Sequence, residues 1–337
     1  MIKRNRGLQC WTILVSGLVV FLAVFSAGVL GQEASGHRLP VNTVAFSPDG
    51  SYLASGSSDG TIMFWDPHTG GHIYTIQYER PVINSLTFSS DGKLLFWGAD
   101  DRTVKVWDTE TRQGKVIMRG HTGPVVDVAV SPRGDRAASA SSGATAVNDP
   151  VRLWHVGTGD CLGVLEGHLA GARSVCYSPD GKLLATGGGG QCGMLMLWNP
   201  EDQRLASHFL AHASFVMDIA FSPDGKHLAT AGFDGKVKTW DLERDNRNSR
   251  TMDHTYGVNA IAYSPDGETL ATACNDQKIH LWDPRRGRRL MSLEGHRSNV
   301  LAVAYSPDGN LLASGGFDRT VRIWDPIRGK CLVIINK

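Results

Sequence analysis

The chain has 337 residues, which is enough for one large domain or two ordinary ones. Its formal charge of +1 argues against a dedicated nucleic-acid binder, because such proteins are usually clearly basic. The six cysteines form no Cys-x-x-Cys pair, so the sequence indicates neither a disulfide framework nor a zinc site. There is also no phosphate-binding loop and no unique pair of nucleophile and base. We therefore expect no catalytic residues, no cofactor, no metal and no nucleic-acid partner.

The first 35 residues differ from the rest of the chain. Three basic residues lie near the start, and the stretch from Trp11 to Leu30 is almost wholly apolar. Such a layout is typical of a secretory signal peptide, and an apolar run of about 20 residues can also span a bilayer as a helix. We expect residues 1–35 to be either a cleaved signal peptide or an uncleaved signal anchor with a short linker. A wrongly assigned start of the chain is a third interpretation. Both main interpretations place residues 36–337 outside the inner or plasma membrane.

A repeat of 42 to 47 residues occupies the remainder of the chain. Its most regular mark is a tryptophan, which recurs at Trp65, Trp107, Trp154, Trp198, Trp240, Trp282 and Trp324. Five of these are followed by Asp, and a Ser-Pro-Asp-Gly turn or a close variant lies about 18 residues upstream of each. Pro fixes φ and Gly supplies φ > 0, so each such turn reverses a strand.

Apolar and polar residues alternate just before each tryptophan, as in Val321-Arg322-Ile323. This period of two indicates a strand with one face inside. Each repeat holds about four short strands, which cannot bury their apolar faces alone. A closed ring of such units buries both faces of each and leaves no long exposed edges. The pattern predicts an all-β fold.

These repeats resemble those of the WD-repeat family, in the period, the Trp-Asp end and the upstream Gly-His. The resemblance covers residues 36–337 and implies a seven-bladed β-propeller of four-stranded antiparallel blades, here preceded by an N-terminal apolar helix. Many members complete the last blade with an N-terminal strand. Here the segment Cys331–Ile335 aligns with other outer strands, so we expect the C-terminus to supply the outer strand of its own blade.

The resemblance also implies a hydrogen-bonded row of His, Ser or Thr, Asp and Trp across each blade. Four repeats carry the whole set: His37, Ser55, Asp59 and Trp65; His212, Thr230, Asp234 and Trp240; His254, Thr272, Asp276 and Trp282; His296, Ser314, Asp318 and Trp324. A Ser-His-Asp catalytic triad is the rival interpretation, but a triad is needed once and this set recurs.

Three repeats depart from the row. The second has Glu79 and Trp97 in place of His and Ser/Thr. In the third an insertion leaves Asn148 or Asp149 to act as the Asp, and the fourth has Cys192 at the Asp position. We expect repeats two to four to be the less stable half of the ring.

The function indicated by this resemblance is a non-catalytic protein–protein interaction scaffold. We expect a monomeric propeller, which the N-terminal segment predicts to be exported. We expect its partner site on the top face, meaning the face with the loops after each Gly-His and before each row Asp. Aromatic and basic residues gather in these loops: Arg38, Phe215, Phe233, Tyr256, Arg297, Phe317 and Arg319. Exposed aromatics with arginine are the composition of binding hot spots. The alternative is that each aromatic only shields the hydrogen-bonded row.

Two other functions stay open at this point. One is an exported enzyme that uses the central channel. The other is a membrane-surface module that uses basic loops of the opposite, bottom face, around Arg285, Arg286, Arg288 and Arg289. An uncleaved N-terminal segment would also make the membrane a partner.

Overall fold

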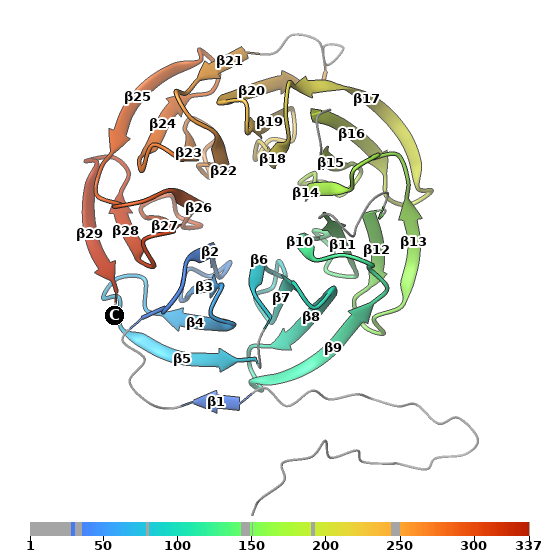
Figure 1. The fold of residues 1–337 in the computed structure, drawn as a ribbon, viewed down its shortest axis with the longest axis horizontal. Helices are drawn as coiled ribbons and strands as arrows, with labels where there is room; N and C mark the ends of the chain where they lie inside the picture. The colour runs from blue at the N-terminus through green and yellow to red at the C-terminus, as the bar shows by residue number, and fades with distance from the viewer. Residues whose placement is uncertain are drawn as a thin grey trace, which may run out of the picture.

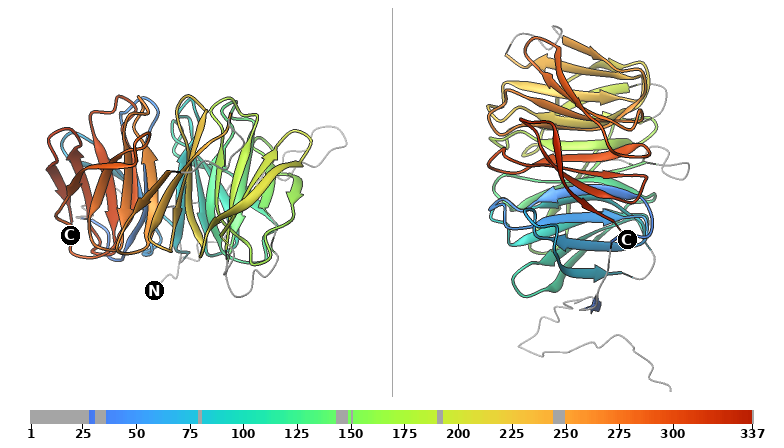
Figure 2. Two further views of the ribbon diagram at one scale, coloured as in Figure 1. Left: turned by 90° about the horizontal axis from the view of Figure 1, so that it is seen from above. Right: turned by 90° about the vertical axis from the view of Figure 1, so that its left-hand side faces the viewer.

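The computed structural model describes residues 36–78, 81–142, 149, 151–189, 193–243 and 250–336, together with the backbone of 28–30. Within these residues the secondary structure consists of strands and turns, without a helix. The strands form seven antiparallel sheets, which Figure 1 shows arranged as blades around a central axis. Seen edge-on in Figure 2, the ring is a disc with loops on both faces. The expected seven-bladed propeller is confirmed.

Each blade uses four consecutive strands, ordered from the axis to the rim. Blade 1 comprises β2 (Val41–Phe46), β3 (Leu53–Ser57), β4 (Thr61–Trp65) and β5 (His72–Gln77). Blade 2 comprises β6 (Ile83–Phe88), β7 (Leu94–Ala99), β8 (Thr103–Asp108) and β9 (Gln113–Arg119). Blade 3 comprises β10 (Val125–Val130), β11 (Arg136–Ser141), β12 (Val151–His155) and β13 (Cys161–Leu165). Blade 4 comprises β14 (Ala172–Tyr177), β15 (Leu184–Gly188), β16 (Gly193–Asn199) and β17 (Arg204–His212).

The second half of the ring repeats this order. Blade 5 comprises β18 (Val216–Phe221), β19 (His227–Gly232), β20 (Lys236–Asp241) and β21 (Arg250–Asp253). Blade 6 comprises β22 (Val258–Tyr263), β23 (Leu270–Cys274), β24 (Ile279–Asp283) and β25 (Arg288–Leu293). Blade 7 comprises β26 (Val300–Tyr305), β27 (Leu312–Gly316), β28 (Val321–Asp325) and β29 (Lys330–Ile335).

The turns between the two innermost strands follow from their sequence. In blade 1, Gly50 adopts a φ of 73°, a conformation that suits glycine because it has no Cβ. The Ser47 side chain accepts the N–H of Tyr52 at 2.9 Å and donates to Asp49. The same Ser and Gly positions recur in the other blades, so one local device reverses the chain each time.

The core of the ring lies between blades. Among the described residues, seven hydrophobic clusters each combine side chains from two neighbouring blades. The seven repeat tryptophans are all buried in or beside them. A single blade has no such core of its own, so the blades stabilise one another by packing.

The seam between blades 7 and 1 closes as we expected. Strand β29 pairs with β28 of the same blade, with Val333 opposite Ile323. No strand is exchanged between these two blades among the described residues. Instead, Val41 and Trp65 of blade 1 share a cluster with Ile323 and Ile335 of blade 7.

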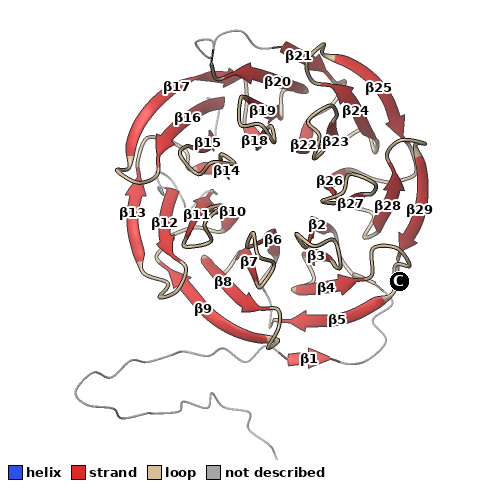
Figure 3. Ribbon diagram, turned by 180° about the vertical axis from the view of Figure 1, so that it is seen from behind, coloured by secondary structure: helices blue, strands red, loops and turns tan. Residues whose placement is uncertain are grey.

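The expected N-terminal helix falls mostly outside the described residues. Of the stretch Trp11–Leu30, the structure describes only β1 (Gly28–Leu30), which runs antiparallel to β5 at the rim of blade 1 (Figure 3). For these three residues the helix prediction is wrong, because the unpaired backbone groups of an edge strand favour the addition of another strand. No helix in the described part of the chain is long and apolar enough to cross a membrane.

Candidate functional site

A hydrogen-bonded row crosses blade 7 from the top face to the core. His296 Nε2 lies 2.7 Å from Ser314 Oγ, and its Nδ1 lies 3.0 Å from Asp318 Oδ2. The Trp324 indole N–H donates to the same Ser314 oxygen at 2.9 Å. Since all of these groups are largely buried, each bond satisfies a polar atom that water does not reach.

Blades 1, 3 and 5 build comparable rows. In blade 5, Thr230 Oγ1 lies 2.8 Å from His212 Nε2 and accepts the Trp240 indole N–H at 3.0 Å. Asp234 Oδ1 lies 3.0 Å from the other ring nitrogen of His212. In blade 3, Asp149 supplies the carboxylate for His121 at 3.1 Å; Asn148, the other candidate, lies outside the described residues. In blade 1, His37 lies 2.7 Å from Ser55, which accepts from Trp65 at 2.8 Å. There Thr61 lies 3.0 Å from His37 Nδ1, and Asp59 is more distant at 3.4 Å.

Blade 6 departs from the expected row. Thr272 still joins His254 at 2.9 Å and accepts from Trp282 at 3.3 Å. Asp276, however, bonds His280 Nε2 at 2.8 Å, and His254 Nδ1 turns to the carbonyl of Met252 instead. The expected His254–Asp276 pair is therefore absent from this blade, because a second histidine two residues before the tryptophan competes for the carboxylate.

Blades 2 and 4 also differ. In blade 2, Trp97 fills the Ser/Thr position, and the buried Lys105 ammonium donates to Asp101 and Thr103. In blade 4, His168 and Trp198 both bond Thr186. Burial lowers the pKa of His168 to about 4. Glu79 and Cys192 lie outside the described residues.

The row carboxylates are ionised. Burial alone would raise the pKa of Asp318, but the hydrogen bond from His296 and the N–H of Arg297 outweigh it and lower the pKa far below its usual range. The pKa values of Asp59 and Asp149 are lowered in the same way, because hydrogen bonds from His37 and His121 outweigh the effect of burial. Each carboxylate thus ties a top-face loop to the blade, as Arg297 N–H does to Asp318 at 2.9 Å.

One backbone bond joins the two top-face loops of every blade. The residue that directly follows the second strand of each blade donates its N–H to a carbonyl in the loop that leads to the innermost strand. The donors are Ser58, Asp100, Ser142, Gly189, Phe233, Asn275 and Phe317, and the acceptors are Pro40, Val82, Pro124, Gly171, Phe215, Gly257 and Asn299. The two loops in each blade therefore form one surface unit.

The structure exposes most of the residues expected to bind a partner. The side chains of Phe233, Tyr256 and Phe317 are 52, 57 and 58% exposed, on blades 5, 6 and 7. Phe215 differs because it is half-buried. Its ring lies nearly perpendicular to that of Phe233, with 6.3 Å between the ring centroids, and the Arg173 guanidinium lies over its face. Three arginines of the same loops are exposed: Arg38, Arg297 and Arg319.

Sequence reasoning missed two aliphatic residues of this face. Leu169 is 81% exposed in the loop before blade 4, and Leu39 is 45% exposed in the loop before blade 1. Around the ring, blade 4 with Leu169 comes just before the three blades that carry the exposed aromatics, and blade 1 with Leu39 comes just after them. A search for large apolar residues of any kind after each Gly-His would have found both.

The central channel is lined by the innermost strands and has a volume of about 340 Å³. It carries two carboxyls, Asp127 and Asp218. Burial, and then the charge of Asp127, raise the pKa of Asp218 to about 7. Asp127 accepts from Val175 N–H, and Asp218 from Ile261 N–H, both at 2.8 Å. These carboxyls thus join neighbouring blades. The residues that line the channel include no histidine, lysine or cysteine.

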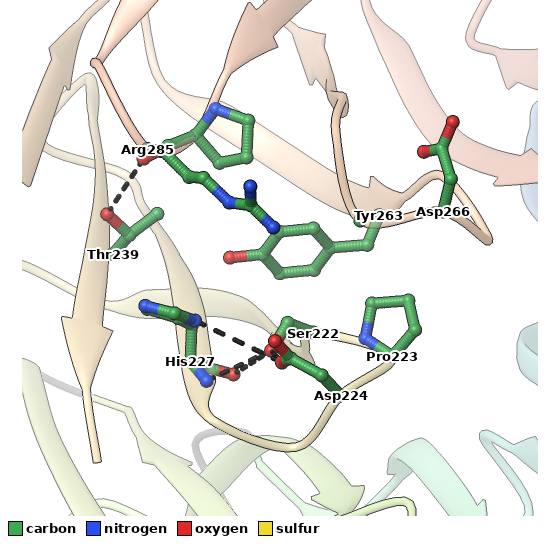
Figure 4. Close-up of a pocket in the computed structure, with 10 residues that line it drawn as sticks. Ser222, Pro223, Asp224, His227, Thr239, Tyr263, Asp266 and Arg285 are labelled. Carbon is green, nitrogen blue, oxygen red and sulfur yellow. Dashed lines mark hydrogen bonds and ion pairs between the residues drawn. The ribbon is translucent and has the colours of Figure 1, made fainter. Parts of the chain in front are cut away.

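The bottom face holds a small cavity between blades 5 and 6, of about 60 Å³ (Figure 4). Figure 4 shows Tyr263 and Arg285 lying beside His227 there. Two arginines of the bottom-face loop of blade 6 form ion pairs: Arg285 lies 3.1 Å from Glu268 and Arg286 lies 2.8 Å from Asp283. These two pairs neutralise part of the basic charge that the sequence places in this loop.

Comparison with known proteins agrees with this architecture. The family model described as "IFT122 first beta-propeller" matches residues 81–283, and that described as "WD domain, G-beta repeat" matches residues 28–66 and 287–325. The chain belongs to the WD-repeat β-propeller family. Its WD-repeat ring is thus a fold of the kind used to bind other proteins.

Several relatives share part of this WD-repeat ring. The nuclear distribution protein PAC1 of Coccidioides posadasii is 42% identical over 159 residues, 45% of this chain and 34% of that protein. The nuclear distribution protein nudF of Aspergillus niger is 31% identical over 184 residues, 53% of this chain and 40% of that protein. Apoptotic protease-activating factor 1 of Rattus norvegicus is 26% identical over 228 residues, 65% of this chain and 17% of that protein. The chain thus spans well under half the length of these curated relatives.

The exported location expected from the N-terminal segment is wrong. Two of the relatives reported above are named for nuclear distribution, and neither name refers to export. The end of the apolar stretch also pairs as strand β1. An uncharged apolar run fits a strand as well as a membrane span, so its composition alone did not decide between them.

Proposed function

We propose that this WD-repeat chain is an interaction scaffold that binds a protein partner through the top face of blades 5, 6, 7 and 1. The observation that carries the proposal is a group of three exposed aromatic side chains on consecutive blades: Phe233, Tyr256 and Phe317. Clustered apolar exposure of this kind usually marks an interaction site.

One exposed arginine lies on the same surface. Arg319 has a φ of 69°, a left-handed conformation that Arg102 and Gln277 share at the equivalent positions of blades 2 and 6, whereas blades 1 and 5 have Gly60 and Gly235 there. Its exposed side chain lies next to Asp318 and two residues from Phe317. The likeness to proteins named for nuclear distribution, and not for a reaction, also supports a binding role.

The main test is the double substitution Phe233→Ser with Phe317→Ser in the full chain. Both side chains are more than half exposed, so we expect the melting temperature to stay within a few degrees of the parent. Partner capture from a native extract, quantified by mass spectrometry against the parent, should fall strongly, by roughly tenfold or more, since hot-spot truncation typically costs 2 kcal/mol or more.

A matched control removes exposed apolar side chains elsewhere. Ile327 lies in a bottom-face loop and is 77% exposed, and Leu290 lies on the outer strand β25 and is 42% exposed. The double variant Ile327→Ser with Leu290→Ser should capture the same proteins as the parent. Unchanged capture by the top-face variant, or loss only together with unfolding, would exclude the proposed surface.

A second variant separates binding from stability. Arg319→Gly removes a top-face charge and also relieves the left-handed backbone. We expect it to weaken capture while raising the free energy of unfolding by about 1 kcal/mol. Chemical denaturation and the same capture assay measure the two effects. A variant that is stabilised yet captures its partners fully would remove Arg319 from the site.

A further inference from the structure

Blade 6 gathers three side chains that can ligate a metal. Cys274 ends strand β23, Asp276 lies in the following loop, and His280 is the second residue of β24. The ligand atoms of these three residues all lie within 4.8 Å of one another. They come from one hairpin, so the turn geometry of the blade holds them together.

The position of Cys274 and the hydrogen bonds of His280 favour ligation. Cys274 is fully buried, and its sulfur lies beside Asp276 and His280. His280 directs Nε2 at Asp276, while its Nδ1 lies 2.8 Å from Ser292 Oγ. A hydrogen bond to the second ring nitrogen is how proteins usually orient a metal-binding histidine.

We propose that Cys274, Asp276 and His280 form a binding site for a zinc-class divalent metal ion. Thiolate, imidazole and carboxylate are the ligands that zinc prefers, and three protein ligands leave the fourth position for water. Zinc–ligand bonds of about 2.0–2.3 Å place tetrahedral ligands roughly 3.3–3.8 Å apart. The three ligand atoms need to move by only about 1 Å to reach that spacing. On binding, the proton of the Cys274 thiol is released to solvent. His280 ligates as a neutral ring through unprotonated Nε2, with its proton on Nδ1 and directed at Ser292 Oγ. The Cys274 thiolate and the Asp276 carboxylate then balance the two positive charges of the ion.

The other blades do not repeat this combination. At the positions of Cys274 and His280, blade 5 has Gly232 and Lys238, and blade 7 has Gly316 and Arg322. A lysine or arginine at the second position would repel a cation. The departure of Asp276 from the row in blade 6 is therefore explained by its place in a different site.

The same three residue types could also form a thiol nucleophile with its base. The geometry opposes this, because His280 uses one nitrogen for Asp276 and the other for Ser292, and neither for the sulfur. An ion can reach the cluster along Asp276, whose side chain is 20% exposed. It would lie beneath the loop of Tyr256, since the carbonyl of that residue is 3.6 Å from the sulfur.

The test is a titration of the metal-free full chain with Co²⁺, which reports its ligands by absorption. We expect one equivalent to give tetrahedral visible bands together with a thiolate-to-cobalt charge-transfer band, both removed by added Zn²⁺. Zn²⁺ alone should raise the melting temperature of the parent by a few degrees. Cys274→Ser should lose the charge-transfer band, and His280→Gln should weaken Co²⁺ affinity by at least tenfold.

Cys161→Ser is the matched control, because Cys161 is an exposed thiol on the outer strand of blade 3. It should keep the full spectrum. The site is excluded if the parent shows no bands at stoichiometric Co²⁺, or if the charge-transfer band survives in Cys274→Ser and disappears in Cys161→Ser. Should Cys274→Ser fail to fold, His280→Gln decides alone: an affinity equal to that of the parent excludes the site.

Discussion

At the scale of single residues, a row carboxylate should matter far more than an exposed one. Asp234 accepts bonds from His212, from Ala213 N–H and from Lys236 N–H. Asp234→Ala should therefore lower the free energy of unfolding by about 1–3 kcal/mol, because it leaves buried donors unpaired. Urea denaturation of the purified chain measures the difference.

Asp202 provides the matched control. It lies in the loop after Trp198, and its side chain is 47% exposed and 3.9 Å from Arg204. Asp202→Ala should cost under about 0.5 kcal/mol. Equal denaturation midpoints for the two alanine variants would show that the row contributes nothing beyond an exposed carboxylate.

The residues of the row were only partly predictable from spacing. Asp234 and Asp318 lie beside their histidines, as the repeat implies. Asp276 occupies the same sequence position but bonds His280, because the outcome depends on a side chain that the repeat pattern leaves variable. The sequence thus limits the partners of a row carboxylate to a few side chains, whereas the choice between two nearby histidines requires coordinates.

At the scale of strands, the outer strand of blade 7 should matter more than the N-terminal segment. Strand β29 pairs with β28 over its whole length and contributes Ile335 to the seam cluster. Deleting residues 331–337 should lower the melting temperature much more than deleting 1–35, which among the described residues removes only the three-residue edge strand β1. Thermal unfolding of the two truncated chains checks this, and equal losses would refute it.

The strands themselves were well predicted, because seven copies of one pattern average out local irregularity. The alternation in Val321-Arg322-Ile323 gives the right strand, and the aligned segment Cys331–Ile335 gives the right partner. The N-terminal stretch has no second copy for comparison. Its apolar composition fits both a membrane helix and a strand, and at Gly28–Leu30 strand pairing prevails.

At the scale of the whole ring, closure depends on side-chain packing at the blade 7–blade 1 seam. Gly315 lies very close to Val41. A Cβ added at Gly315 would be 2.6 Å from the Val41 Cγ1 and 3.1 Å from the Val41 carbonyl oxygen. Gly315→Ala should therefore push the two blades apart and cost about 1–3 kcal/mol, the usual effect of overpacking. Because every blade depends on its neighbours, calorimetry should still show a single transition.

Gly71→Ala is a suitable control for this change. Gly71 lies in an exposed loop of blade 1, where the nearest side-chain atom to an added Cβ is Thr69 Oγ1 at 3.1 Å. Its cost should stay within about 0.5 kcal/mol. A seam variant as stable as this control would show that the two blades can separate without loss.

The backbone bond that joins the two top-face loops of each blade has a consequence for engineering. The N–H of residues such as Phe233 and Phe317 makes that bond, while their side chains point away from it into solvent. Proline, which lacks the N–H, is the one residue that this bond excludes. The ring is therefore a natural display scaffold: a library varied at residues 58, 100, 233, 275 and 317 changes the chemistry of the top face of five blades while the backbone that presents it stays the same.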